Sequence, residues 1–155
     1  KEIFGDLIKV ILEELDIEFR ALGSTTFKNK NMAKGVEPDE CFYIEHETVI
    51  RGKTRIDLTI DQPPDLVIEV DITSRTLFDN YEKLGVPELW QYDGKTLQIH
   101  LLQNGQYLAS ETSHHFPNIP IIEAIPSYLR ESKINGRNAT IKKFRAWIVQ
   151  LKGDK

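Results

Sequence analysis

The sequence has few of the features that mark secreted, membrane-bound or thiol-dependent proteins. Only one of its 155 residues, Cys41, is a cysteine, which excludes an internal disulfide and a cluster of thiolate metal ligands. No segment approaches the ~18 consecutive apolar residues that a membrane span needs, and no charged-then-apolar secretory signal is present at the N-terminus. We therefore expect a cytoplasmic protein that does not insert into a membrane.

The sequence also lacks the signatures of two large enzyme groups. It has no glycine-rich phosphate loop and no Gly-x-Ser-x-Gly nucleophile elbow. Its four histidines show no ligand-like spacing, and His114 and His115 are expected on the surface of a loop. Cys41 falls on an expected strand, where a lone cysteine is more typical of the core than of a nucleophile.

The remaining composition suits one globular domain. Hydrophobic residues make up 40% of the chain, which is enough for one core, and no linker or repeat divides residues 1–155. The net charge of −4 conceals a basic segment, because residues 130–155 hold eight Lys and Arg residues and two acidic residues. This segment either steers a polyanion or is the solvated face of a terminal helix.

Hydrophobic periodicity and turn residues predict the elements of an α/β fold. Apolar residues at helical spacing predict a first helix, and alternating or continuous apolar runs predict strands. Asp93-Gly94 and Asn104-Gly105 are hairpin signals between the later strands. The resulting prediction is a central mixed β-sheet flanked by helices, with helices at 2–15, 74–84, 126–133 and 139–151 and extended segments at 17–22, 41–44, 54–60 (an edge strand), 65–72, 89–92, 96–102 and 106–110.

The run from residue 63 to residue 73 contains most of the candidate functional residues. Side chains alternate across a strand, so three apolar residues from Leu66 to Val70 share one face, while Asp65, Glu69 and Asp71 share the other. Burying carboxylates without partners is costly. A solvent-facing edge strand would avoid that cost, but the run is as apolar as a central strand. We therefore favour a functional strand over an edge strand.

Spacing decides which of these carboxylates can share a metal ion. Glu69 and Asp71 lie about 6.6 Å apart along a strand, so both side chains can lean onto one Mg²⁺ or similar cation. Asp65 is about 13 Å from Glu69 on the same reckoning, so we expect it to support the site or to cap a backbone turn after the two prolines. The missing ligand should come from a neighbouring strand, for which Asp39 is the best source.

These residues resemble a known nuclease site. Asp39 and the Glu69-Val70-Asp71 run are similar to the acidic half of the PD-(D/E)xK motif. The sequence also resembles the Uma-two family of restriction-endonuclease-like domains, most specifically in PDLVIEV (residues 64–70) and GVPELW (residues 85–90). The resemblance implies a restriction-endonuclease-like core and hydrolysis of DNA phosphodiester bonds with Mg²⁺ (or Mn²⁺). Asp39, Glu69 and the Val70 carbonyl would bind the metal.

The chain departs from the motif at one position. The motif places a lysine two residues after the glutamate, where this sequence has Asp71, which can bind a cation but cannot stabilise a phosphate as a lysine does. The helix that follows offers Arg75 and Lys83, and we take Lys83 as the candidate basic residue. Its place near the C-terminal end of that helix also suits the helix dipole.

The sequence therefore predicts a divalent-metal-dependent endonuclease acting on DNA, with Asp39, Glu69, Asp71 and Lys83 as catalytic residues and Asp65 as a supporting acid. Paired active sites would cut both strands, so a homodimer is expected. The absent motif lysine keeps one alternative open, a catalytically inactive relative that binds nucleic acid or protein. A structural module with a solvent-facing acidic strand is a further alternative.

Overall fold

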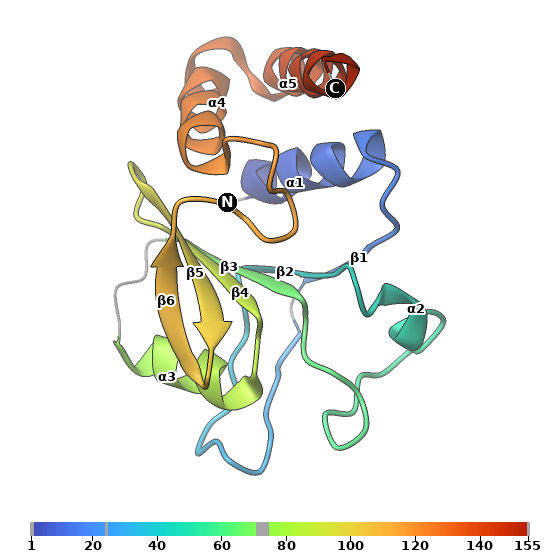
Figure 1. The fold of residues 1–155 in the computed structure, drawn as a ribbon, viewed down its shortest axis with the longest axis vertical. Helices are drawn as coiled ribbons and strands as arrows, with labels where there is room; N and C mark the ends of the chain where they lie inside the picture. The colour runs from blue at the N-terminus through green and yellow to red at the C-terminus, as the bar shows by residue number, and fades with distance from the viewer. Residues whose placement is uncertain (1, 24, 71–74, 155) are drawn as a thin grey trace.

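A computed structural model describes residues 2–23, 25–70 and 75–154 (Figure 1). Asp71, predicted above as a metal ligand, lies outside the described residues. None of the described helices has the length and apolar character needed to cross a bilayer. In chain order the elements are α1 (Glu2–Glu14), β1 (Arg20–Leu22), β2 (Glu40–Tyr43), α2 (Glu47–Ile50), β3 (Leu66–Val70), α3 (Arg75–Leu84), β4 (Glu88–Tyr92), β5 (Leu97–Gln103), β6 (Gln106–Ser110), α4 (Ile121–Asn135) and α5 (Arg137–Gly153).

The six strands form one mixed sheet in sequence order, from β1 to β6. Every neighbouring pair is antiparallel except β3 and β4, which are parallel. A parallel pair cannot be joined by a tight hairpin, and α3 forms the crossover between β3 and β4. The predicted α/β fold with a central mixed sheet and flanking helices is therefore confirmed.

The two faces of the sheet pack against different helices. Figure 1 shows α1, α4 and α5 stacked beyond one face and α3 beneath the other. Leu66 and Ile68 belong to the core that includes α1, α4 and α5, whereas Val67 belongs to the smaller core that contains Tyr81 of α3. The alternation of β3 side chains follows the predicted pattern, so Glu69, two residues after Val67, faces α3.

The basic residues of α5 bind acidic residues of its neighbours. Arg145 contacts Glu13 and Glu14 at the end of α1, at 2.9 and 2.7 Å. Arg137 binds Asp6 of α1 at 2.9 Å, and Lys143 binds an acidic residue of α4. Several basic residues of the C-terminal segment are therefore paired with acidic residues of α1 and α4 on the surface of the helical layer.

The structure corrects the prediction for residues 54–60, where it shows turns and no strand. Lys53 forms an ion pair with Asp61, which also accepts the Asp57 N–H at 2.8 Å, and the Asp57 carboxylate accepts the Thr59 N–H. These local bonds close the segment into a loop. Its polar and apolar residues alternate as in a strand because Ile56 and Leu58 pack against the smaller core, whereas Ile60 is 74% exposed.

The prediction for α4 was wrong at its N-terminal end. The sequence predicted a helix over residues 126–133. It begins at Ile121 instead, directly after Pro120, whose carbonyl oxygen accepts the Ala124 N–H at 2.9 Å. Pro126 lies inside α4 and is buried. That residues 1–155 form a single domain stays a prediction.

Candidate functional site

Glu69 is the centre of the candidate site. Glu69 is 3% exposed and is the last residue but one of β3. Its side chain projects from the face of the sheet that α3 covers. The hydroxyl of Tyr81, from the middle of α3, donates a hydrogen bond to Glu69 Oε1. Tyr81 itself is fully buried. The parallel crossover through α3 therefore brings a phenol onto the carboxylate from the helix that follows the strand.

Asp39 reaches the same region from the start of β2. Its Oδ2 accepts the backbone N–H of Val70 at 2.8 Å. The antiparallel register pairs Glu40 with Ile68, and continuing it by one residue sets Asp39 opposite Glu69. Residues directly opposite in an antiparallel pair project to the same face. The structure thus brings these two predicted ligands together on one face of the sheet.

The electrostatics around Glu69 reflect its burial and its acidic neighbour. Burial is the main reason that the pKa of Tyr81 lies far above its ordinary value, with the charge of Glu69 next and that of Asp39 contributing further. Burial raises the pKa of the Cys41 thiol to about 12. Tyr81 is therefore a fixed hydrogen-bond donor at neutral pH, and Cys41 is a core residue whose thiol donates to the Leu22 carbonyl at 3.2 Å.

Two residues of this region were missed by the reasoning from sequence. Tyr81 was not singled out, because its hydroxyl gains a role only when α3 folds back onto β3. Gln91 pairs with Glu69 in the parallel β3–β4 register, so it lies beside Glu69 on the neighbouring strand. A polar residue inside the apolar run of β4 was the available signal for Gln91.

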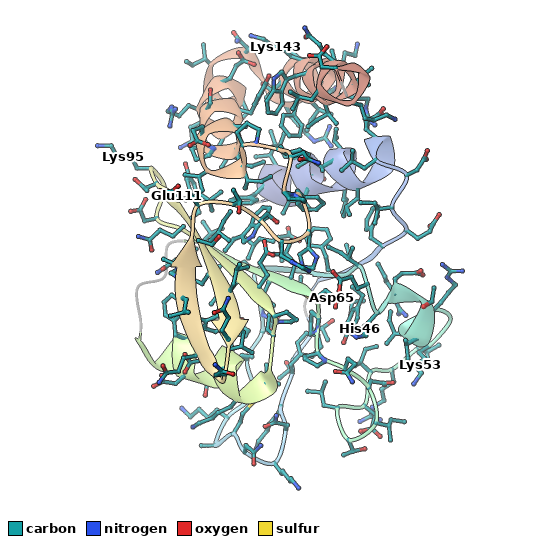
Figure 2. The ribbon with its side chains drawn as sticks, in the orientation of Figure 1. His46, Lys53, Asp65, Lys95, Glu111 and Lys143 are labelled. Atoms are coloured by element: carbon teal, nitrogen blue, oxygen red, sulfur yellow. The ribbon has the colours of Figure 1, made fainter. Side chains whose placement is uncertain are left out.

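Asp65 lies at the other end of the same strand run, in a different environment (Figure 2). Its carboxylate is 1% exposed and accepts the backbone N–H groups of Ile44 and His46 at 2.7 and 2.9 Å. The His46 ring nitrogen Nδ1 lies 2.5 Å from the second carboxylate oxygen. Asp65 therefore caps the turn after β2, whereas the sequence predicted a cap on a turn after the two prolines.

Lys83 lies on α3 but is exposed. It follows Tyr81 by two residues, about 200° around the helix, so it leaves α3 on a different side from the residue that contacts Glu69. Its backbone carbonyl accepts a hydrogen bond from Asn29 at 2.9 Å. The side chain of Arg75 is outside the described part of the chain. A catalytic role for Lys83 stays a prediction.

The donor set around Glu69 fits a small, hard cation. Asp39 and Glu69 offer carboxylate oxygens, and each already has one oxygen held by a protein donor, Val70 N–H or Tyr81 O–H. Mg²⁺ is commonly bound through one or two carboxylates with water completing its shell. Within residues 2–23, 25–70 and 75–154, no three His, Cys, Asp or Glu side chains group as metal ligands. The full predicted set includes Asp71 and so stays a prediction.

One family model matches most of the chain. The model of the Uma2 family, described as "Putative restriction endonuclease", matches residues 1–131. The chain belongs to the Uma2 family. The family resemblance of the sequence is therefore confirmed, and the matched residues include both Asp39 and Glu69.

The solved structures that are similar to this Uma2 chain include the following one. It is titled as the crystal structure of "a putative nuclease belonging to DUF820" from Anabaena variabilis ATCC 29413. The two chains are 16% identical, with a TM-score of 0.49, and the match covers 94% of this chain and 79% of the other. No curated protein matches the sequence.

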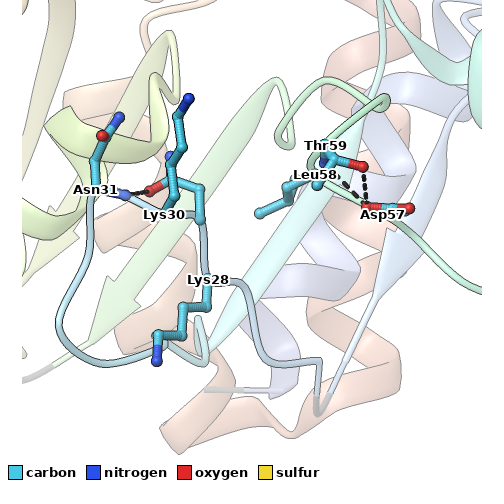
Figure 3. A pocket seen from close by; sticks show the side chains of 7 residues that line it. Lys28, Lys30, Asn31, Asp57, Leu58 and Thr59 are labelled. Atoms are coloured by element: carbon cyan, nitrogen blue, oxygen red, sulfur yellow. Dashed lines mark hydrogen bonds between the residues drawn. The ribbon is translucent and has the colours of Figure 1, made fainter.

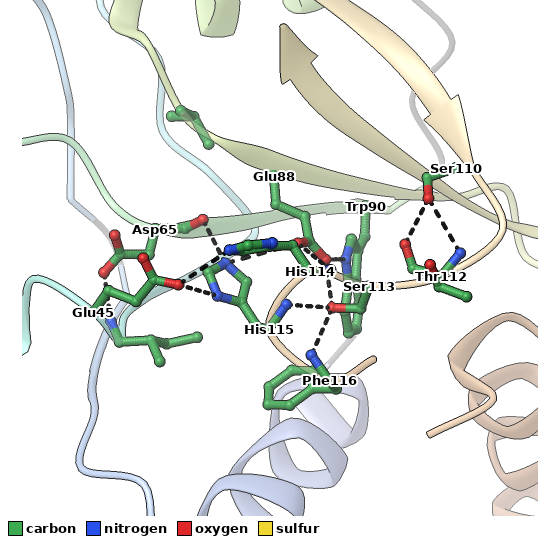
Figure 4. Close-up of polar contacts among 12 residues, drawn as sticks. Glu45, Asp65, Glu88, Trp90, Ser110, Thr112, Ser113, His114, His115 and Phe116 are labelled. Atoms are coloured by element: carbon green, nitrogen blue, oxygen red, sulfur yellow. Dashed lines mark hydrogen bonds and ion pairs between the residues drawn. The ribbon is translucent and has the colours of Figure 1, made fainter. Parts of the chain in front are cut away.

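A further buried carboxylate in this Uma2 chain organises the segment after β6 (Figure 4). Glu88 is 1% exposed and accepts hydrogen bonds from Trp90 Nε1, Ser113 Oγ and the His114 N–H at 2.6, 2.7 and 3.0 Å. The expectation that His115 is a surface residue was wrong, because its side chain is 3% exposed. Its Nε2 lies 3.0 Å from the Asp65 carbonyl oxygen. This network fastens residues 113–116 to the sheet.

A pocket of about 540 Å³ lies between the loop before β2 and the loop before β3 (Figure 3). Lys28 and Lys30 line one wall, and Asp57 and Thr59 line the other. Figure 3 shows the hydrogen bond from the Thr59 hydroxyl to the Asp57 carboxylate within that second wall. The Asn29 side-chain amide joins the lysine-bearing loop to the Lys83 carbonyl at the end of α3. Opposite charges on the two walls give the pocket no single preference for an anion.

Proposed function

We propose that this protein is a divalent-metal-dependent endonuclease that hydrolyses DNA phosphodiester bonds. The observation that carries the proposal is the pairing of Asp39 and Glu69 on one face of the sheet, each held by a protein hydrogen-bond donor. Membership of the Uma2 family, described as a restriction endonuclease family, supports the same reaction class. Mg²⁺ or Mn²⁺ is the proposed cofactor.

The residues of this chain would hold and orient the reacting groups. Asp39 and Glu69 would bind the metal, with the Val70 carbonyl and Asp71 completing the protein ligands. When bound, the metal supplies a water molecule of lowered pKa and stabilises the charge that develops on the phosphate. Lys83 is the proposed basic residue of α3. Asp65 is proposed to support the site indirectly, by fixing the turn that joins β2 to the rest of the chain.

A cleavage assay tests the proposal. Supercoiled plasmid and single-stranded DNA are incubated with the purified protein in Mg²⁺ or Mn²⁺, with EDTA as the metal-free condition. The wild-type protein should cleave only with metal, and Glu69→Gln and Asp39→Asn should cleave at least about 100-fold more slowly. Glu111→Gln, at an exposed position after β6, is the matched control and should retain the wild-type rate. Lys83→Ala tests the proposed basic residue separately.

One observation favours a second function. Asp71 replaces the motif lysine, and an acid at that position does not stabilise a phosphate. The alternative is an inactive nuclease fold that binds nucleic acid or protein. The alternative would be supported if the protein binds DNA in a gel-shift assay, if Glu69→Gln leaves this binding unchanged, and if no cleavage occurs with either metal. The same results would contradict the endonuclease proposal. A homodimer is also proposed. Analytical ultracentrifugation of the protein bound to DNA would test it by giving the mass of the complex.

A further inference from the structure

The loop of residues 25–35, called the lysine loop below, carries positive charge without any acid of its own. It contains Lys28, Lys30 and Lys34 and no Asp or Glu, in a chain whose net charge is −4. All three lysines are exposed, and none forms a salt bridge with another described residue. Because charges of one sign attract polyanions of the other, the lysine loop is a cationic surface on an acidic protein.

The lysine loop is fixed to the rest of the protein. Phe27 and Val36 close its base, because each donates its N–H to the carbonyl oxygen of the other, at 2.7 and 2.8 Å. The Asn29 amide donates to the Lys83 carbonyl at the end of α3, at 2.9 Å. Phe27, Met32 and Val36 are buried in the smaller core. A loop that is already ordered loses less entropy when it binds a ligand, so its lysines start from fixed backbone positions.

The lysine loop lies on the face of the sheet that carries Glu69. Its anchors, Phe27 and Val36, belong to the same core as Tyr81, whose hydroxyl is bonded to Glu69. Asp39 follows Val36 by three residues, so their Cα atoms are at most about 11 Å apart. A DNA duplex carries one charge per about 1.7 Å of its axis, so a few base pairs cover this distance.

Arg55 adds a positive charge from the loop that faces the lysine loop. It is exposed, and together with Lys28 it lines a pocket of about 440 Å³. Asp57 lines the same pocket, so the interior contains both signs of charge. Figure 3 shows the Lys28 and Lys30 side chains extending in different directions along their own wall, and neither extends toward Asp57. These lysines are therefore available to phosphates that pass over the pocket without entering it.

The basic C-terminal segment is less suited to substrate DNA. Arg137, Lys143 and Arg145 of α5 are paired with acidic residues of α1 and α4. Figure 1 shows α4 and α5 beyond one face of the sheet and α3, which covers Glu69, beneath the other. The lysine loop thus differs from the C-terminal segment both in its unpaired charge and in its position on the side of the candidate site.

We propose that the lysine loop, together with Arg55, is the surface that holds the phosphate backbone of substrate DNA beside the candidate site. This inference rests on the proposed function, because it takes DNA as the ligand. Side-chain cations that neutralise phosphates release condensed counterions, and each contact contributes about 0.9 to the slope of log Kd against log salt concentration. Contacts to the backbone carry no base sequence directly, so affinity should depend little on sequence.

The test is fluorescence anisotropy of a labelled DNA duplex in EDTA, at several salt concentrations, with the full chain. The test variant combines Lys28→Gln, Lys30→Gln and Lys34→Gln. The matched control combines Arg130→Gln, Lys133→Gln and Lys142→Gln, which replace exposed residues of α4 and α5. Both triple variants make the net charge more negative by three, so a difference between them reports on the place of the charge.

We expect the test variant to raise Kd at least about 10-fold at physiological salt and to reduce the salt slope by about 2.7. The control should keep the wild-type slope. Replacing the three lysines with arginine should keep it as well, because arginine also binds phosphate. Arg55→Gln alone should reduce the slope by about 0.9, and this single variant decides if the triple variant does not fold.

The results separate the failure of this inference from the failure of the proposed function. If the two triple variants bind like the wild type, or lose affinity equally, the inference is wrong, while metal-dependent cleavage by the wild type would still support the endonuclease. No binding of the duplex by the wild type would also overturn the inference. Binding that depends on the lysine loop, in a protein that does not cleave with either metal, would support the inference and contradict only the endonuclease.

Discussion

Asp65 and Glu69 come from one run of eleven residues, 63–73, and their different partners separate a structural carboxylate from a candidate functional one. Both are at most 3% exposed. Asp65 accepts two backbone N–H groups and lies against the His46 ring, so its negative charge is stabilised by donors that belong to the turn it caps. Glu69 has the neutral hydroxyl of Tyr81 as a donor and the acidic Asp39 on the same face of the sheet.

The comparison teaches that burial alone does not identify a functional acid. A carboxylate that binds several backbone N–H groups is explained by the fold, because those groups need an acceptor. A buried carboxylate beside a second one is better explained by a shared cation, since like charges at close range oppose each other. Variants of the two residues should therefore fail in different assays.

The largest effect is expected on stability, for Asp65→Ala. The change leaves the N–H groups of Ile44 and His46 without an acceptor in a buried turn, so the free energy of unfolding should fall by about 4 kcal/mol. Urea unfolding followed by circular dichroism measures it. Asp93 is an exposed carboxylate that also accepts two backbone N–H groups, and Asp93→Ala should lower stability less. Equal losses for both variants would contradict the role of burial.

Glu69→Gln should have the opposite profile. Glutamine keeps an oxygen that can accept the Tyr81 hydroxyl, so the free energy of unfolding should change by less than about 1 kcal/mol. Metal-dependent DNA cleavage should fall at least about 100-fold, because the metal loses a charged ligand. A Glu69→Gln protein that unfolds as readily as Asp65→Ala would place Glu69 among the structural residues instead.

A smaller effect is expected for His46→Ala. The ring contributes one side-chain contact to Asp65 and is 38% exposed, while the backbone N–H of residue 46 remains as a donor. We expect a loss of about 1.5 kcal/mol in the free energy of unfolding, measured as for Asp65→Ala. Cleavage by this variant should equal that of the wild type. A cleavage defect without loss of stability would connect the Asp65 region to the active site.

The smallest effect concerns Asp61, another carboxylate that closes a loop. The Lys53 side chain, as its hydrogen-bond partner, lowers the pKa of Asp61 below its ordinary value of 3.8, and the Asp57 N–H lowers it further. Because the folded-state pKa is lower than the unfolded one, the ionised carboxylate stabilises the fold above about pH 4, and this contribution is lost as the pH falls through the folded-state pKa. Asp61→Asn should therefore lower Tm at pH 7 and have little effect near pH 2, in thermal scans at each pH. A pH-independent difference would exclude ionisation as the cause.

Local patterns in the sequence predicted most of the fold and the pairing at the centre of the site. The period-two alternation of residues 65–70 places Glu69 on one face, and Asp39 directly precedes the neighbouring strand β2, so both could be found without knowing the tertiary structure. The loop at residues 54–60 was missed because its alternation resembles a strand, while the Lys53–Asp61 pair that closes it depends on three-dimensional contact.

The parts that the sequence did not reveal depend on which side chains meet across elements. The Tyr81 hydroxyl reaches Glu69 only when α3 packs on the sheet. The burial of the His115 side chain accompanies the hydrogen bonds that attach residues 113 and 114 to Glu88. Strand spacing set Asp65 apart from Glu69, but it could not reveal its partners at residues 44 and 46, which belong to the turn after β2. The roles of Asp71 and Lys83 stay predictions.

Titration of the protein with Mn²⁺ tests the contrast between the two carboxylates most directly. Electron paramagnetic resonance of free Mn²⁺ gives the bound fraction for the wild type, Glu69→Gln and Asp65→Asn, each first shown to be folded by circular dichroism. We predict that the wild type and Asp65→Asn bind Mn²⁺ with similar affinity and that Glu69→Gln binds at least about 10-fold more weakly. Equal binding by the wild type and Glu69→Gln, or no binding by the wild type, would contradict the assignment of Glu69 as a metal ligand.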